Sequence, residues 1–230
     1  MKIDILTLFP EMFISPFDYS IIKRAKDKGL VEIKIHNLRD WTTNERKTVD
    51  DRPFGGGAGM VMMIEPVFKA LSDLKNKSTK VVLLTPQGKT FNQKSAVDLS
   101  TLSHLIFLCG HYEGIDERIR KHLIDQEISL GDFVLTGGEL PAMVVTDSIV
   151  RLINGVLKKE EATLRESFSE IEINHKKIKL LEYPQYTRPA NFNGWKVPEI
   201  LLSGDHKKIT NWQNKEALAV TNKKRPDLLK

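Results

Sequence analysis

The sequence has few of the features that form disulfides or anchor a chain in a membrane. Cys109 is the single cysteine among 230 residues, which excludes an internal disulfide and favours a reducing compartment such as the cytoplasm. Every apolar run is far shorter than the roughly 20 residues that a membrane helix needs, and the first residues lack the long apolar stretch of a signal peptide. Repeats and low-complexity tracts are absent as well. We therefore expect a cytoplasmic protein that has no membrane partner.

Common ligand motifs are also missing. Residues 88–90 (Gly-Lys-Thr) resemble the end of a phosphate-binding P-loop, but Leu83 occupies the position of its first glycine. The glycines at 55–59 do not complete a dinucleotide-binding pattern, because Met60 holds its last position. One cysteine and six scattered histidines provide no spacing for zinc. The residues therefore predict neither of these nucleotide sites and no metal site.

The first 157 residues alternate short apolar strands with helices. Apolar residues make up 40% of the chain and charged residues 28%. A chain of this length and composition can bury a hydrophobic core without disulfides or a structural metal ion. This alternation predicts a mostly parallel α/β sheet. Strands are expected at 3–8, 31–37, 81–84, 105–108 and 124–129. Helices are expected at 20–28, from 65 onward, and at 92–99, 116–123 and 139–157, with a long loop at 38–60.

The character of the chain changes after residue 157. Residues 158–179 are polar and charged, and we interpret them as a linker or mobile loop. Residues 180–230 contain an amphipathic helix that Asp205 is placed to cap. Residues 1–157 hold 20 Lys and Arg and 20 Asp and Glu, whereas residues 158–230 hold 15 and 10 and carry the entire net charge of +5. Such a basic tail suggests a polyanionic partner, although a solvated surface explains the charge alone equally well.

Glycine-rich loops follow several of the expected strands. Ten of the 14 glycines lie between residues 55 and 138. Glycine lets the backbone approach a ligand closely, and ligands of open α/β sheets bind beyond the carboxyl ends of the strands. A shared pocket is therefore favoured over a set of ordinary turns, and His111 is interpreted as a hydrogen-bonding loop residue. The four loops lie at 51–60, 85–88, 109–118 and 129–139.

Six motifs follow one another along nearly the whole chain. They are Asp51–Met60 (DRPFGGGAGM), Cys109–Arg118 (CGHYEGIDER), Ser129–Ala142 (SLGDFVLTGGELPA), Tyr183–Pro189 (YPQYTRP), Leu201–Gly204 (LLSG) and Arg225–Leu229 (RPDLL). In this order the motifs resemble those of the bacterial tRNA (guanine-N1)-methyltransferases of the SPOUT class.

This resemblance implies a fold and an activity. The family fold is an α/β domain whose parallel sheet contains a deep trefoil knot, followed by a small C-terminal helical domain. We accordingly expect a SPOUT methyltransferase domain at 1–157, a flexible linker at 158–179 and a tRNA-binding domain at 180–230. The implied reaction transfers a methyl group from S-adenosylmethionine to N1 of guanine at tRNA position 37, next to the anticodon. The implied assembly is a homodimer, and Mg²⁺ is a further ligand that the resemblance leaves open.

The resemblance also assigns roles to individual residues. Glu166, where many members carry aspartate, matches the general base, and Arg151 matches the arginine near guanine O6. A carboxylate that removes the N1 proton frees this nitrogen to attack, and an arginine stabilises the charge that then forms on O6. Substrate contacts are expected from Gly59, Arg188, Lys207 and Lys208. Donor contacts are expected from Pro86, Gln87, Gly110, Tyr112, Glu113, Leu130, Gly131, Asp132, Phe133, Val134, Leu135, Gly137, Gly138 and Pro141.

Two other functions fit parts of the sequence. A noncatalytic RNA-binding protein would explain the basic tail, and a metabolite-binding α/β enzyme would explain the glycine-rich loops. The pair of Arg151 and Glu166 favours the methyltransferase, because a protein that only binds RNA needs neither a base nor a charge-stabilising arginine. The charge of the tail disfavours an enzyme that has no RNA partner.

Overall fold

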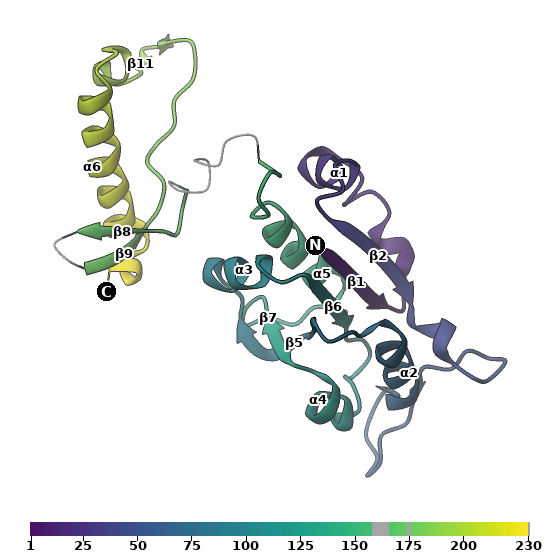
Figure 1. The fold of residues 1–230 in the computed structure, drawn as a ribbon. Helices are drawn as coiled ribbons and strands as arrows, with labels where there is room; N and C mark the ends of the chain where they lie inside the picture. The colour runs from purple at the N-terminus through teal and green to yellow at the C-terminus, as the bar shows by residue number, and fades with distance from the viewer. Residues whose placement is uncertain (158–165, 174–175, 230) are drawn as a thin grey trace. The chain divides into compact units, whose positions relative to one another are not determined.

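The computed structural model describes residues 1–157, 166–173 and 176–229 (Figure 1). Its contacts divide the chain into two compact units, residues 1–158 and residues 159–230. The first unit contains a parallel sheet covered by helices, and the second contains short hairpins and one long helix. Each unit is a body of its own and is described separately.

The first unit is built on a parallel sheet. Its strands are β1 (Lys2–Thr7), β2 (Glu32–Asn37), β3 (Asp50–Asp51), β4 (Val61–Met62), β5 (Thr79–Thr90), β6 (His104–Cys109) and β7 (Gln126–Ser129). Five of them form the sheet in the order β2-β1-β6-β5-β7, and every neighbouring pair is parallel. The short strands β3 and β4 pair with each other in antiparallel orientation.

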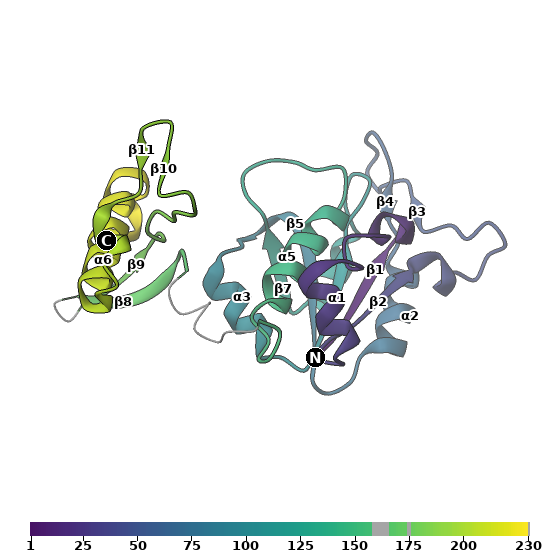
Figure 2. The same cartoon turned by 90° about the horizontal axis from the view of Figure 1, so that it is seen from above.

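Helices cover both faces of this sheet (Figures 1 and 2). They are α1 (Ser20–Asp27), α2 (Ile64–Leu74), α3 (Gln93–Ser100), α4 (Glu117–Leu123) and α5 (Glu139–Val150), with two 3-10 turns, η1 (Pro10–Phe13) and η2 (Leu38–Trp41). Helices α1, α3 and α5 share one core with Val82 and Phe107, and α2 and α4 share the other with Leu83 and Leu108. Successive side chains of a strand thus enter opposite cores, which gives a three-layer α/β domain.

The predicted alternation of strands and helices in a parallel α/β domain is confirmed. The expected strands at 3–8, 81–84 and 105–108 correspond to β1, β5 and β6. Two details differ. The expected loop at 38–60 contains η2 and β3, and α5 ends at Val150 rather than at residue 157. Gly155, at φ +82°, adopts the left-handed conformation that often follows a helix end.

A charged cluster is buried near the amino-terminal ends of the central strands. The fully buried Asp4 carboxylate lies 2.6 Å from Lys2 Nζ, 2.7 Å from His104 Nε2 and 2.8 Å from His36 Nε2. His104 Nδ1 lies 2.7 Å from the Thr79 hydroxyl. Burial alone would raise the pKa of Asp4, but hydrogen bonds from His36, Lys2 and His104 hold this pKa well below its usual range. The cluster therefore joins four strands through one ionised carboxylate.

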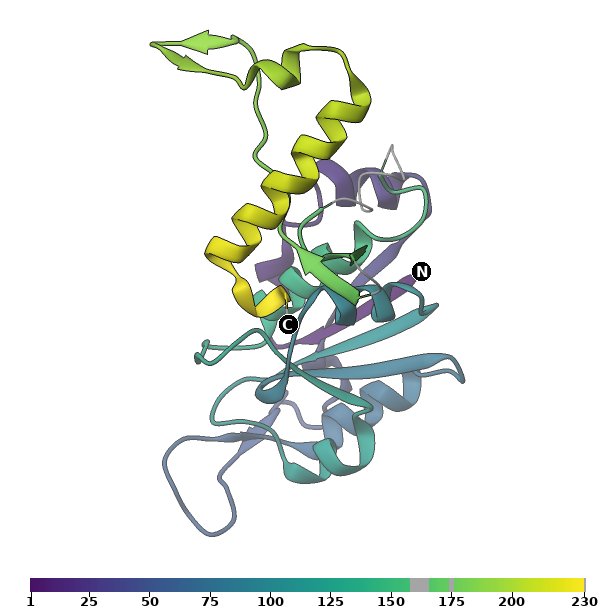
Figure 3. The same ribbon diagram turned by 90° about the vertical axis from the view of Figure 1, so that its left-hand side faces the viewer.

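The second unit is arranged around one long helix. Its elements are β8 (Ser169–Ile173), β9 (Lys176–Leu180), β10 (Asn191–Phe192), β11 (Trp195–Lys196), η4 (Glu199–Leu202), α6 (His206–Lys224) and η5 (Pro226–Leu229). Asp205 caps α6 as predicted, because its carboxylate accepts the Lys208 N–H at 3.1 Å. The Leu181 N–H donates to the Thr221 hydroxyl of α6 at 2.8 Å. Figure 3 shows β10 and β11 beyond the amino-terminal end of α6, at the far end of the unit from η5.

The structure corrects the expected linker at 158–179. Strands β8 and β9 pair as an antiparallel hairpin, from Ser169 opposite Leu180 to Ile173 opposite Lys176. Apolar residues alternate with polar or charged ones along both strands, which is the two-residue period of a half-covered strand. The high charge of the segment favoured a linker over the strands that this alternation indicates. The remaining parts of the expected linker, 158–165 and 174–175, lie outside the described residues.

Candidate active site

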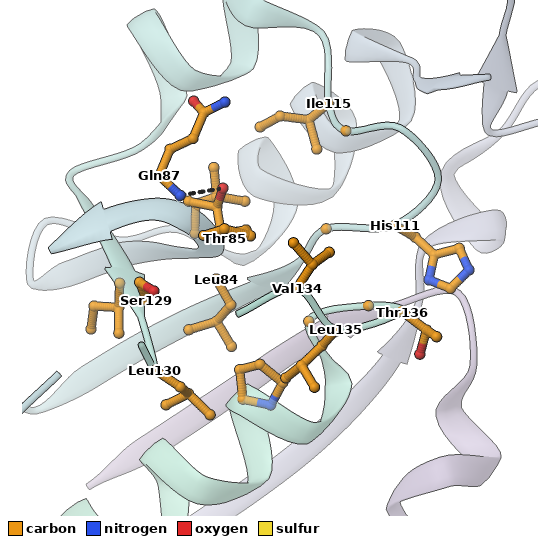
Figure 4. Close-up of a pocket in the computed structure, with 18 of the residues that line it drawn as sticks. Leu84, Thr85, Gln87, His111, Ile115, Ser129, Leu130, Val134, Leu135 and Thr136 are labelled. Atoms are coloured by element: carbon orange, nitrogen blue, oxygen red, sulfur yellow. Dashed lines mark hydrogen bonds between the residues drawn. The ribbon is translucent and has the colours of Figure 1, made fainter. Parts of the chain in front are cut away.

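A cavity of about 250 Å³ lies at the carboxyl ends of β5, β6 and β7 (Figure 4). Ligands of open α/β sheets bind at this edge. The structure brings three of the four glycine-rich loops together around the cavity, and Figure 4 shows Ser129 and Leu130 at one end and His111 and Thr136 at the other. The loops come from different strands, so the parallel sheet itself creates the site.

The first wall is an irregularity in β5. Leu84 and Lys89 both pair with Ile128 of β7, so residues 85–88 leave the ladder of the sheet and bulge toward the cavity. A Cβ on Gly88 would lie 2.4 Å from the Ile128 nitrogen, which is too close for any side chain. Glycine therefore permits the two strands to approach here.

The loop after β6 forms the second wall and is held from two sides. The Gly138 N–H donates to the Gly110 carbonyl at 2.8 Å, and the Glu113 N–H donates to the Met60 carbonyl at 3.1 Å. A Cβ on Gly138 would lie 2.6 Å from Cys109 Cα. Backbone meets backbone at this crossing, so a side chain at position 138 would force the loops apart.

The loop after β7 forms the third wall. The Ser129 hydroxyl donates to the Gly131 carbonyl at 3.0 Å and accepts the Gly131 N–H at 3.1 Å. Gly131 has φ +155°, and its carbonyl also accepts the Phe133 N–H at 2.9 Å. After this tight turn, Phe133, Val134 and Leu135 remain 54%, 83% and 38% exposed. The turn thus presents apolar side chains at the cavity.

Most predicted donor-binding residues line this cavity. The exceptions are Gly131 and Asp132, which form the turn before Phe133 and do not face the cavity. The residues that do line it are Pro86, Gln87, Gly110, Tyr112, Glu113, Leu130, Phe133, Val134, Leu135, Gly137, Gly138 and Pro141. Their role in donor binding stays a prediction.

Arg120 of α4 is a polar lining residue that the sequence prediction missed. Its guanidinium lies 2.9 Å from Glu127 Oε2 and 3.3 Å from Glu117 Oε2, and it also hydrogen-bonds the Gln87 side chain. Its spacing of three residues from Glu117 predicts an ion pair on a helix, but it does not predict that the Arg120 side chain lines the cavity. Six further lining residues lie in the loops predicted to share a pocket, although none was named as a donor contact: Thr85, His111, Gly114, Ile115, Ser129 and Thr136. Besides Arg120, the missed lining residues outside those loops are Leu83, Leu84 and Ile128, which lie on strands.

Burial and nearby carboxylates keep two side chains at the second wall protonated. Burial raises the pKa of Tyr112, and the charge of Asp50 raises it further. Burial raises the pKa of Cys109 well above its usual value, and Glu139 adds to this effect. The Cys109 thiol is therefore a poor nucleophile. His111 Nδ1 is buried without a hydrogen-bond partner in the described structure.

The predicted substrate residue Gly59 lies against the cavity wall. A Cβ at this position would lie 2.4 Å from Glu113 Cγ and 2.7 Å from Glu113 Oε1. Glu113 itself lines the cavity. The loop expected to meet the guanine and the loop expected to meet the donor therefore touch at these two residues.

The predicted catalytic pair is divided between the two units. Arg151 is the C-cap of α5, and its N–H donates to the Asp147 carbonyl at 3.3 Å. Glu166 belongs to the second unit, where its carbonyl accepts the Ser169 N–H at 3.1 Å. Both side chains are half-buried. Their joint role stays a prediction.

The remaining predicted substrate contacts lie on the second unit. Arg188, Lys207 and Lys208 are all exposed. Lys207 and Lys208 lie in the first turn of α6, where the helix dipole adds positive potential to their charge. Lys208 Nζ also lies 3.2 Å from Asp205, which neutralises part of that charge.

The described residues offer little to a metal ion. Within 1–157, 166–173 and 176–229, no three His, Cys, Asp or Glu side chains form a group that could hold one. The Mg²⁺ ion that the resemblance leaves open therefore gains no ligand set here. None of the described helices is both long and apolar enough to span a membrane.

The fold and the site define an α/β protein with a ligand cavity that backbone loops enclose at the carboxyl edge of a parallel sheet. The tRNA (Guanine-1)-methyltransferase TrmD family matches the chain over residues 1–230. A tRNA (guanine-N(1)-)-methyltransferase of Dictyoglomus turgidum is 57% identical over 229 residues, which cover 100% of this chain and 90% of the relative. Enzymes of the same name from Carboxydothermus hydrogenoformans and Staphylococcus carnosus are 54% and 55% identical, across 100% of this chain and 88% and 91% of theirs. The chain belongs to the tRNA (guanine-N1)-methyltransferase family.

Proposed function

We infer that this enzyme transfers the methyl group of S-adenosylmethionine to N1 of guanine in tRNA, and we propose position 37, beside the anticodon, as the target. The observation that carries the inference is the cavity at the carboxyl edge of the sheet, in a chain that matches the family from end to end. Bound S-adenosylmethionine would supply an electrophilic methyl group.

The residues of the cavity suit this donor. Leu84, Leu130 and Leu135 supply apolar surface for an adenine ring, and the loops that meet at Gly110 supply main-chain polar groups. The Glu113 carboxylate would attract the positive end of the donor. Glycine at position 138 keeps the wall thin, because a Cβ there would strike the backbone of Cys109.

The proposed chemistry belongs to Glu166 and Arg151. Guanine N1 carries a proton, so Glu166 would remove this proton as general base. Negative charge then develops on O6, and Arg151 would stabilise it. A methyl group on a sulfonium is already activated, so alignment of the base with the donor supplies much of the remaining acceleration.

We further propose the trefoil knot of the family for residues 1–157. Support comes from the family match and from the close approach of Gly138 to Cys109, where the loop after β7 lies against the end of β6. This contact lies at the wall of the cavity, so the knot would hold that wall together.

A cytoplasmic homodimer is also part of the proposal. Leu140 and Val144 lie four residues apart on α5 and are 50% and 48% exposed, although both are apolar. A second copy of the chain would cover such a face. Sedimentation at micromolar concentration should show a dimer, and a stable, fully active monomer would contradict it.

The substrate is tested with two tRNA transcripts that differ only at position 37. With labelled S-adenosylmethionine, a transcript that has guanine at this position should take up one methyl group per molecule. A transcript that has adenine there should take up none. Equal labelling of both would contradict the proposed position, and labelling of neither would contradict tRNA as the substrate.

A further inference from the structure

The hairpin of β10 and β11 carries two large aromatic side chains that the fold leaves exposed. Trp195 is 76% exposed and Phe192 is 56% exposed. The two residues lie directly opposite each other, so both rings lie on one face of the hairpin, with centroids 6.1 Å apart. Figure 3 shows the hairpin projecting beyond α6. An exposed pair of this kind indicates an interaction surface.

The hairpin is built to hold this face in place. The pairing of Phe192 with Trp195 leaves Asn193 and Gly194 as a two-residue turn, and their φ values are +50° and +85°. Two positive φ values in an Asn-Gly turn match the type I′ geometry that fits the twist of a hairpin. The Asn191 side chain accepts the Gly194 N–H at 3.0 Å and closes the turn. The turn thus fixes the backbone that carries the two rings.

The charge around the hairpin is positive. Arg188 and Lys196 are the only charged residues between positions 183 and 198, and the carboxylates nearest in sequence are Glu182 and Glu199. Lys196 lies opposite Asn191, on the face of the hairpin away from the rings. Proteins bind single-stranded nucleic acid with this combination, in which bases stack on aromatic rings and cations follow the phosphates.

We propose that Phe192 and Trp195 form a stacking platform for an unpaired base of the RNA substrate. The inference rests on the proposed function, which supplies an RNA with unpaired loop nucleotides. Every base has a π-face, so such a platform tolerates any sequence. The hairpin therefore contributes affinity and orientation, and the choice of the target guanine is made elsewhere in the enzyme.

The test measures the affinity of the full-length chain for an unmodified tRNA transcript over a range of salt concentrations. Trp195→Ala should weaken binding about tenfold at every concentration, because one base–ring stack is lost. The slope of log affinity against log salt should not change, since no phosphate contact is removed. Trp195→Phe should restore affinity to within about twofold, whereas Trp195→Leu, which is apolar but has no ring, should behave like the alanine variant. Lys196→Ala is the matched control, because it should reduce the salt slope.

Several results would overturn the platform. One is wild-type affinity in Trp195→Ala, and another is full rescue by Trp195→Leu, which would indicate apolar burial instead of stacking. A third is a Trp195→Ala chain that dissociates in sedimentation but binds tRNA normally, which would assign the face to a second copy. If the wild-type enzyme methylates tRNA but the hairpin variants bind tRNA normally, only the platform is refuted and the proposed function stands. If the wild-type enzyme does not methylate tRNA, both the proposed function and the platform are refuted.

Discussion

The two units of this chain are stabilised in different ways. In the first unit, α1, α3 and α5 on one side and α2 and α4 on the other bury apolar cores against a parallel sheet. Among residues 166–170 and 178–229, the part of the second unit whose burial is described, Leu180 and Ala217 are the only apolar side chains that are buried. Residues 1–157 have no net charge, whereas residues 158–230 carry +5.

This difference indicates separate roles for the two units. A rigid, neutral domain can hold a small ligand between backbone loops, because its strands fix the position of those loops. A small basic domain has a small hydrophobic core, but its positively charged surface can bind a polyanion. We therefore expect changes in the first unit to affect donor binding and stability, and changes in the second to affect RNA binding and the proton transfer.

The largest expected effect follows from removing the proposed base, since this places one step of the chemistry in the second unit. Glu166→Gln keeps the size of the side chain but removes its basicity. A positioned general base contributes about 10²–10⁴-fold, so the single-turnover rate of methyl transfer should fall by that factor. Glu166→Asp should retain most of the rate. Glu170→Gln, which changes a nearby exposed carboxylate, is the control and should leave the rate unchanged.

The same assay tests Arg151 in the first unit. Arg151→Ala should slow transfer by a factor of similar order, because a charge-stabilising donor is lost. The two losses should not add fully, since the arginine has less charge to stabilise when the proton stays on N1. Fully additive losses would mean that the two residues act on separate steps.

The next effect concerns the stability of the first unit. Asp4→Asn should lower the free energy of unfolding at pH 7 by about 2–3 kcal/mol, because a buried hydrogen-bonded charge is removed. The folded pKa of Asp4 is depressed, so its contribution is present above the unfolded pKa of about 3.9 and is lost as the pH falls below it. Urea unfolding should therefore show the difference between variant and wild type shrinking below about pH 4. A difference that is constant down to pH 2 would contradict the ionised cluster.

A smaller effect is expected at the backbone crossing beside the cavity. Gly138→Ala places a Cβ 2.6 Å from Cys109 Cα, so the loops must separate. Such overpacking should lower the free energy of unfolding by about 1–3 kcal/mol. S-adenosylmethionine binding measured by calorimetry should also weaken, because the separated walls fit the donor less well. Gly110→Ala is the matched control, because its nearest neighbour would be the Leu84 carbonyl at 3.4 Å, an ordinary contact. Equal losses in both variants would indicate blockage of the cavity instead of separation of its walls.

The smallest expected effect belongs to the basic surface of the second unit. Replacing both Lys207 and Lys208 with alanine should weaken tRNA binding a few-fold and should lower the salt slope by about one to two. Donor affinity should stay at the wild-type value, because neither residue belongs to the first unit. An unchanged salt slope would remove the first turn of α6 from the RNA interface.

Local patterns in the sequence predicted much of the first unit. Apolar runs at 81–84 and 105–108 predicted two central strands, and the glycines after them predicted loops that meet at the carboxyl edge. Those features depend on neighbouring residues and on a general property of parallel sheets. The placement of Asp205 before α6 was equally local, because a helix cap acts over three residues.

Other features depend on contacts between distant residues and could not be predicted in this way. The pairing of Leu84 and Lys89 with the same residue of β7 arises from the register of two strands. Arg120 of α4 lines the cavity through contacts with Gln87, which lies far from it in the sequence, and with Glu127, which lies on β7. The β8–β9 hairpin carried a readable alternation, but the charge of the segment favoured a linker. Roles for Arg151 and Glu166 came from the resemblance alone, because no local pattern joins residues of two units.

The most direct test of the proposed function identifies the atom that becomes methylated. The full-length enzyme is incubated with unmodified tRNA and with S-adenosylmethionine that has an isotope-labelled methyl group. The tRNA is then digested to nucleosides, which are separated and identified by mass spectrometry. We expect a single labelled product, 1-methylguanosine, in an amount that approaches one per tRNA. Label in a different nucleoside, on a ribose, or in no RNA at all would contradict the proposed function.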